Sequence, residues 1–111
     1  MSVAMNFPND ETGQVLTEMH QAGIDLLVQH EVVFFHLFEK QEQAQAMADH
    51  IKALMPNVHI NVQPDESPNV WDANCTMSMI PSYENVMEQE STFEKIAETF
   101  KGYSDGWGIE A

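Results

Sequence analysis

Five histidines are the residues in this chain best suited to metal binding or proton transfer. A zinc site needs three or four ligands that converge, usually with short spacings in the sequence, and these residues are scattered: His20, His30, His36, His50 and His59. A single cysteine, Cys75, provides neither a cysteine-based zinc cluster nor an internal disulfide. The sequence therefore predicts no metal site and no cofactor.

His36 differs from the other histidines because it lies between Phe34 and Phe38 in the most apolar stretch of the chain. A buried histidine can ligate a cofactor or carry a proton. It can also be structural, with one ring nitrogen bonded to a backbone carbonyl, and we expect that role here. Cys75 has apolar neighbours and no cation close to it in the sequence, so we expect an inert thiol packed in the core.

The carboxylates are the other candidate chemistry, since 18 Asp and Glu residues face 4 lysines, for a net charge of -14. Such a surface repels phosphate, which argues against direct binding of nucleic acid or of anionic membranes. A basic protein is the natural partner, although the charge also serves solubility alone. Nothing resembles a phosphate-binding glycine loop or a nucleophile elbow, so we expect no enzymatic activity and no catalytic residue.

Six residues are predicted to contact a partner protein. Five are acids that we expect to be exposed in a loop or on the last helix, and the sixth is a tryptophan between two glycines: Asp65, Glu66, Glu84, Glu88, Glu90 and Trp107. Tryptophan is enriched at interface hot spots. The alternative for Trp107 is that its indole closes one end of the core.

The element that must position these residues is the stretch 31–38, Glu-Val-Val-Phe-Phe-His-Leu-Phe. Its β-branched and aromatic residues predict a strand, and a short buried helix is the alternative. Both faces of that strand are mainly apolar, so we expect it in the interior of a sheet with both faces covered.

The remaining elements follow from periodicity and from stop signals. Helices are expected from about residue 10 to Gly23, over 39–55 before Pro56, and from Ser82 to Gly102. Strands are expected at 58–63, 70–79 and 103–110, the last with a bulge at a glycine.

This order predicts an α+β fold, a ferredoxin-like βαββαβ antiparallel sheet with an extra N-terminal helix. In that fold the first and third strands are central, and two helices cover one face. We expect the extra helix to cover the other face, with a dimer contact over Phe34 and Phe38 as the alternative. Residues 1–8 are expected to be a flexible N-terminus without a signal peptide, and residues 9–111 a single domain.

The chain also resembles a known family. The resemblance rests on Asp10-Glu11-Thr12-Gly13, on Gly23-Ile24-Asp25-Leu26, on the aromatic strand after it, and above all on Tyr103-Ser104-Asp105-Gly106-Trp107-Gly108. Together these look like the regulator of ribonuclease activity B family, protein inhibitors of ribonuclease E. Ser104 is one residue more than the usual tyrosine-aspartate-glycine-tryptophan run.

The resemblance implies a cytoplasmic, non-enzymatic protein of ferredoxin-like fold that modulates RNA turnover by binding a protein, with ribonuclease E as the implied partner. The rival hypothesis is a small-ligand or cofactor-binding protein or enzyme, in the form of a dimeric barrel whose pocket is lined by His36. The sequence leaves open whether the chain is a monomer or a homodimer.

Overall fold

The computed structural model describes residues 7–110, which form three helices and four strands. Most of the predicted flexible segment falls on residues 1–6, outside the described residues. The elements are α1 (Glu11–Gln21), β1 (His30–Phe38), α2 (Gln41–Leu54), β2 (His59–Pro64), β3 (Trp71–Met79), α3 (Tyr83–Thr99) and β4 (Tyr103–Ile109).

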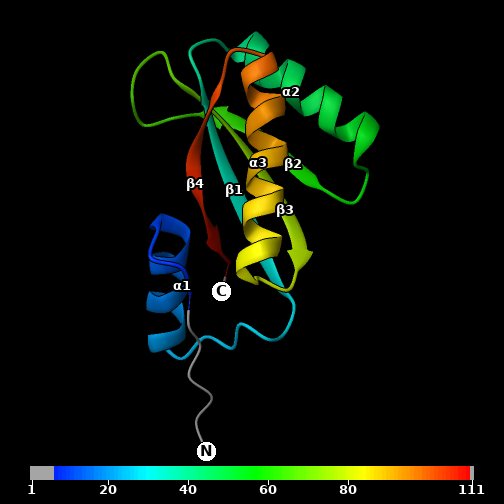
Figure 1. Cartoon of the computed structure of the whole chain (residues 1–111). Coiled ribbons are helices and arrows are strands. Elements are labelled where there is room, and N and C mark those ends of the chain that lie inside the picture. The colour runs from blue at the N-terminus through cyan, green and yellow to red at the C-terminus, as the bar shows by residue number, and fades with distance from the viewer. Residues whose placement is uncertain (1–6, 111) are drawn as a thin grey trace, which may run out of the picture.

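The four strands form one antiparallel sheet in the order β2-β3-β1-β4. The segment predicted from residues 31–38 is the interior strand β1, paired with β3 on one side and β4 on the other. The helices α2 and α3 lie together against one face of the sheet (Figure 1). The fold is therefore α+β with a ferredoxin-like arrangement, preceded by the N-terminal helix α1.

The main core lies between the sheet and α2 and α3. Phe34 and Phe38 are each 1 % exposed, and the Phe34 ring lies 5.3 Å from the ring of Phe93 on α3. Met47 and Ile51 of α2 are fully buried in the same cluster. Phe34 and Phe38 are thus covered within one chain, so the alternative of a dimer contact over them is wrong.

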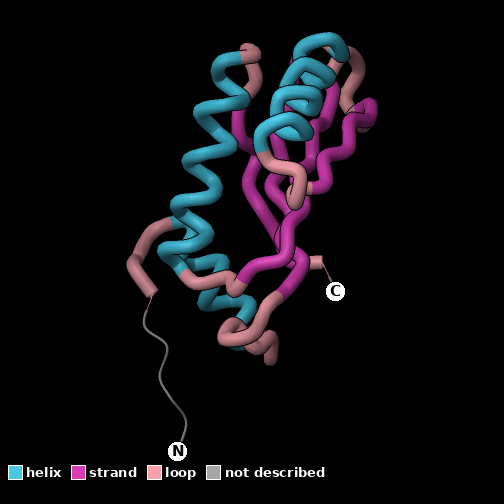
Figure 2. The backbone as a smooth tube through the Cα atoms, turned by 90° about the vertical axis from the view of Figure 1, so that its right-hand side faces the viewer, coloured by secondary structure: helices cyan, strands magenta, loops and turns pink. Residues whose placement is uncertain are grey.

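The prediction that the N-terminal helix α1 covers the second face of the sheet is wrong. The helix packs beside α3, on the same side of the sheet as the other helices, rather than on the opposite face (Figures 1 and 2). Its buried side is narrow, consisting of Thr12, Gly13 and Leu16, and is too small to cover a sheet face. The second face of the sheet, with Phe35 and Leu37, is therefore left without a helix over it.

The end of α3 differs from the prediction by one residue. Lys101, not Gly102, takes the left-handed conformation, with φ 68°. The Gly102 amide then donates to the Ala97 carbonyl at 2.8 Å, which completes a Schellman cap. Gly102 is required for another reason, because a Cβ there would lie 2.3 Å from the Phe38 ring.

The predicted bulge in the last strand is present. Phe34 pairs with Trp107 and His36 with Ser104, so Asp105 and Gly106 together face the single residue Phe35. Gly106 has φ 102°, which glycine adopts without strain. The bulge absorbs the extra residue and leaves Trp107 on the helix-covered face, directly across from Phe34.

Candidate functional site

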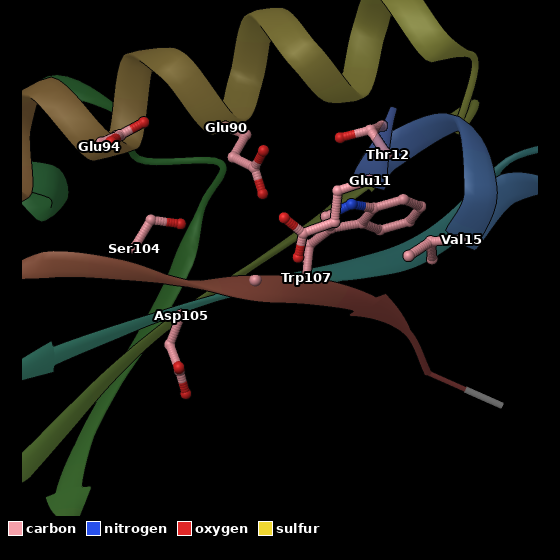
Figure 3. A pocket seen from close by; sticks show the side chains of 9 residues that line it. Glu11, Thr12, Val15, Glu90, Glu94, Ser104, Asp105 and Trp107 are labelled. Carbon is pink, nitrogen blue, oxygen red and sulfur yellow. The ribbon is translucent and has the colours of Figure 1, made fainter. Parts of the chain in front are cut away.

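A groove of about 390 Å³ lies between α1, α3 and β4 (Figure 3). The Trp107 indole lies beneath the first turn of α1 in this groove, next to Thr12 and Val15. Because Trp107 is only partly buried and packs against the core cluster, it both closes the core and presents an aromatic surface. The packing supports the role of closing the core, and the contact with a partner protein stays a prediction. The lining residues are Glu11, Thr12, Val15, Glu90, Glu94, Ser104, Asp105, Gly106 and Trp107.

Three carboxylates on the helices line the groove, and Glu94 lies farther along α3 from the indole than Glu90 does (Figure 3). Glu90 and Glu94 are one turn apart on α3, and Glu11 reaches toward Glu90 from the first turn of α1 (Figure 3). Asp105 also lines the groove, but its side chain points to the other side of β4 (Figure 3). The groove therefore combines negative charge with an aromatic face.

The proximity of these carboxylates changes how readily Glu90 ionises. Burial raises the pKa of Glu90, and the charges of Glu94 and Glu11 raise it further. A cationic side chain placed among the three carboxylates would relieve this repulsion. The same cation would lie near the indole, where cation–π attraction adds to the ion pairs. The arrangement is suited to bind a lysine or arginine side chain.

The position of α1 is fixed by Asp10 at its N-cap. Asp10 Oδ1 accepts from the Gly13 amide at 2.8 Å, and Oδ2 accepts from the Tyr83 hydroxyl at the start of α3. The hydrogen bond from Tyr83 is the main reason why the pKa of Asp10 is lowered. Gly13 is needed here, because a Cβ would lie 1.8 Å from the Pro8 carbonyl oxygen. These contacts hold Glu11 over the groove.

The structure brings together only two of the six predicted partner-binding residues, Glu90 and Trp107. Glu84 and Glu88 are exposed nearer the start of α3. Asp65 and Glu66 belong to the β2–β3 loop, at the opposite end of the sheet from α1 (Figure 1).

Sequence reasoning missed two of the helix carboxylates that line the groove, Glu11 and Glu94. The spacing of Glu90 and Glu94 is a local signal, since side chains four residues apart share one helix face. Glu11 has no such signal, because its approach depends on where α1 docks.

His36 and Cys75 have the structural roles predicted for them. His36 is fully buried, with Nδ1 at 3.2 Å from the Ala73 carbonyl oxygen and its ring edge-on to Phe93. Burial lowers the pKa of His36, so the neutral form is favoured. Burial also raises the pKa of the Cys75 thiol to about 12, which leaves it unreactive at neutral pH. His36 thus packs in the core instead of lining a cofactor pocket.

Residues 7–110 contain neither a metal-binding cluster nor a membrane-spanning helix. No group of three or more His, Cys, Asp or Glu side chains in this range is placed to hold a metal ion. Within the same residues, no helix has both the length and the apolar composition needed to cross a membrane.

Comparison with known proteins identifies the family. Residues 9–109 match the family model described as regulator of ribonuclease activity B, which spans nearly the whole chain. No curated protein matches the chain. The matched region includes every element of the groove, from α1 to the Trp107 strand. The chain therefore belongs to the regulator of ribonuclease activity B family.

Proposed function

We propose that this protein regulates RNA turnover without catalysis, by binding ribonuclease E through the acidic groove around Trp107. The match of residues 9–109 to a family of ribonuclease regulators is the observation that carries the proposal. The groove adds its chemistry, since carboxylates beside an indole suit a basic side chain of the partner.

The partner contact has two parts in this proposal. The net charge of -14 attracts a basic surface at long range and speeds association. The exposed acids Glu84 and Glu88 extend the negative surface along α3 toward its start. The groove then holds one lysine or arginine against Trp107, and this anchor supplies most of the affinity. Asp65 and Glu66 contribute only to the long-range field, because their loop lies at the other end of the sheet.

The test is co-purification with ribonuclease E at low and high salt, using variants matched in charge. Glu11→Lys with Glu94→Lys changes two exposed groove carboxylates, and Glu39→Lys with Glu66→Lys changes two exposed carboxylates outside it. The two double variants have the same net charge, so the long-range attraction between each of them and a basic partner is similar. We expect the double variant in the groove to weaken binding to ribonuclease E at least about tenfold more than the control double variant does.

Two results would contradict the proposal. Equal binding by the two doubles would remove the groove from the contact and leave net charge as the cause. Absence of any salt-sensitive complex between the unmodified protein and ribonuclease E would remove the ribonuclease E partner itself.

A further inference from the structure

The second face of the sheet carries an apolar strip that no helix of residues 7–110 covers. Val33, Phe35 and Leu37 alternate along β1 on this face, opposite the residues that pack beneath α2 and α3. Leu37 pairs with Tyr103 of β4, whose side chain is 54 % exposed and extends the strip sideways. A hollow of about 520 Å³ lies over Val33 and Phe35.

A band of polar side chains, with His59 paired to Thr76 among them, borders the strip on its β2–β3 side. Asn74 pairs with both Phe35 and Asn61, so these three side chains form one row across the face. Thr76 forms the next row with Val33. The face thus has an apolar side and a hydrogen-bonding side that run parallel to the strands.

Acidic residues lie at both ends of the strip. Glu31 is two residues before Val33 on the same face, and the Glu110 amide donates to the Glu31 carbonyl at 2.9 Å. Toward the other end, Asp72 pairs with Leu37, and Asp105, which faces Phe35 across the bulge, points its side chain to this side of β4 (Figure 3). All four lysines belong to or adjoin α2 and α3, so none lies on these strands: Lys40, Lys52, Lys95 and Lys101.

We propose that this face docks an amphipathic α-helix of a partner protein, with basic residues at both ends of the docked segment. Glu31 and Leu37 are about 20 Å apart along the strand, at roughly 3.3 Å per residue. A helix rises about 1.5 Å per residue, so ~13 residues span that length. Its apolar side would cover Phe35, Leu37 and Tyr103, because Val33 is already buried (7 % exposed). Its basic ends would meet Glu31 and Glu110 at one end of the strip, and Asp72 and Asp105 toward the other.

The charges distinguish this occupant from the alternatives. A second copy of the chain would bring the same acidic pairs and a net charge of -14 against this face. A nucleic acid would meet the same repulsion. The inference goes beyond the proposed contact at Trp107, because the two surfaces lie on opposite faces of the sheet.

The test is titration of the full chain with an 18-residue helical peptide that has leucines along one side and lysines near both ends. Amide NMR shifts are expected to centre on Val33, Phe35 and Asn74. Phe35→Lys should weaken binding at least tenfold. The matched control is Leu54→Lys, which makes the same charge change at an exposed leucine of α2 (62 % exposed). Tyr103→Lys provides a second variant on the strip that removes no buried side chain.

A peptide of the same composition in scrambled order keeps the charge but loses the apolar side of the helix. It should bind at least tenfold more weakly. Equal binding by the scrambled peptide would overturn the proposal, as would shifts centred on Glu11, Glu90 and Trp107, or the absence of saturable shifts. Sedimentation that shows a dimer dissociated by Phe35→Lys would overturn it in favour of a second copy. Saturable binding of a single-stranded RNA that moves the same amides would overturn it in favour of nucleic acid.

Discussion

At the scale of single residues, the buried His36 links the stability of the core to pH. Its one hydrogen bond is made by Nδ1 to the Ala73 carbonyl, and Nε2 is buried without a partner among the described residues. Protonation would place a charge beside Phe93 in the core. Because burial lowers the pKa of His36, the folded state resists that protonation.

The first prediction concerns acidification. A histidine whose folded pKa lies below its unfolded value of 6.5 contributes stability above pH 6.5, and this contribution is lost as the pH falls toward the folded pKa. The free energy of unfolding should therefore fall faster with acid in the wild type than in His36→Leu, by up to about 1.4 kcal/mol per pH unit. Urea unfolding at pH 7.5, 6.5 and 5.5 measures this, and a difference that is independent of pH would contradict it.

The second prediction separates the adjacent residues at the end of α3. Lys101 has the left-handed backbone conformation, which glycine adopts at lower cost than a residue with a Cβ. Lys101→Gly should therefore raise the free energy of unfolding by about 1 kcal/mol. Gly102→Ala should lower it by about 1–3 kcal/mol, because the new Cβ meets the Phe38 ring. Thermal and urea unfolding of both variants measure the effects. A lower free energy of unfolding in Lys101→Gly would contradict the account, because it would mean that Lys101 does not hold the left-handed position.

At the scale of elements, α1 is attached to the fold by few contacts. None of its residues belongs to the main core cluster, although Leu16 is fully buried. The bond between Asp10 and Tyr83 is the hydrogen bond that ties it to α3. Opening of α1 would remove Glu11 from the groove and uncover Trp107.

The third prediction follows from that attachment. Tyr83→Phe removes the hydrogen bond and should make the Trp107 indole more accessible, while global unfolding changes little. Acrylamide quenching of Trp107 fluorescence in a Trp71→Phe background measures the exposure. Tyr103→Phe, the same change at an exposed tyrosine of β4, is the control. Identical quenching in the two variants would show that Tyr83 does not hold α1.

The elements differ in how far the sequence predicts them. Periodicity and stop residues locate the helices and strands, and the two-sided apolar pattern of residues 31–38 places β1 inside the sheet. The docking of α1 could not be predicted, because it depends on the contact of Asp10 with Tyr83, 73 positions apart in the sequence. Glu11 was missed in the groove for the same reason, whereas Trp107 was found because an indole between glycines is conspicuous.

At the scale of the whole molecule, the layers separate two surfaces of different chemistry. The helix-covered side carries the groove, where acids surround an indole, and the other side carries an apolar strip between acidic ends. Because the chain has 18 acidic residues and 4 lysines, the electrostatic potential outside both surfaces is negative. A basic protein is attracted to either surface, and local shape decides which part of it binds where.

The most direct test of the central claim is the rate at which purified ribonuclease E cleaves an RNA substrate as this protein is added. We predict that the wild type slows cleavage, and less so at high salt. Trp107→Ala should need at least about tenfold more protein for the same effect. Leu27→Ala, which truncates a side chain that is 71 % exposed in the loop before β1, should act like the wild type. Cleavage that is unchanged by the wild type, or slowed equally by Trp107→Ala, would contradict the account.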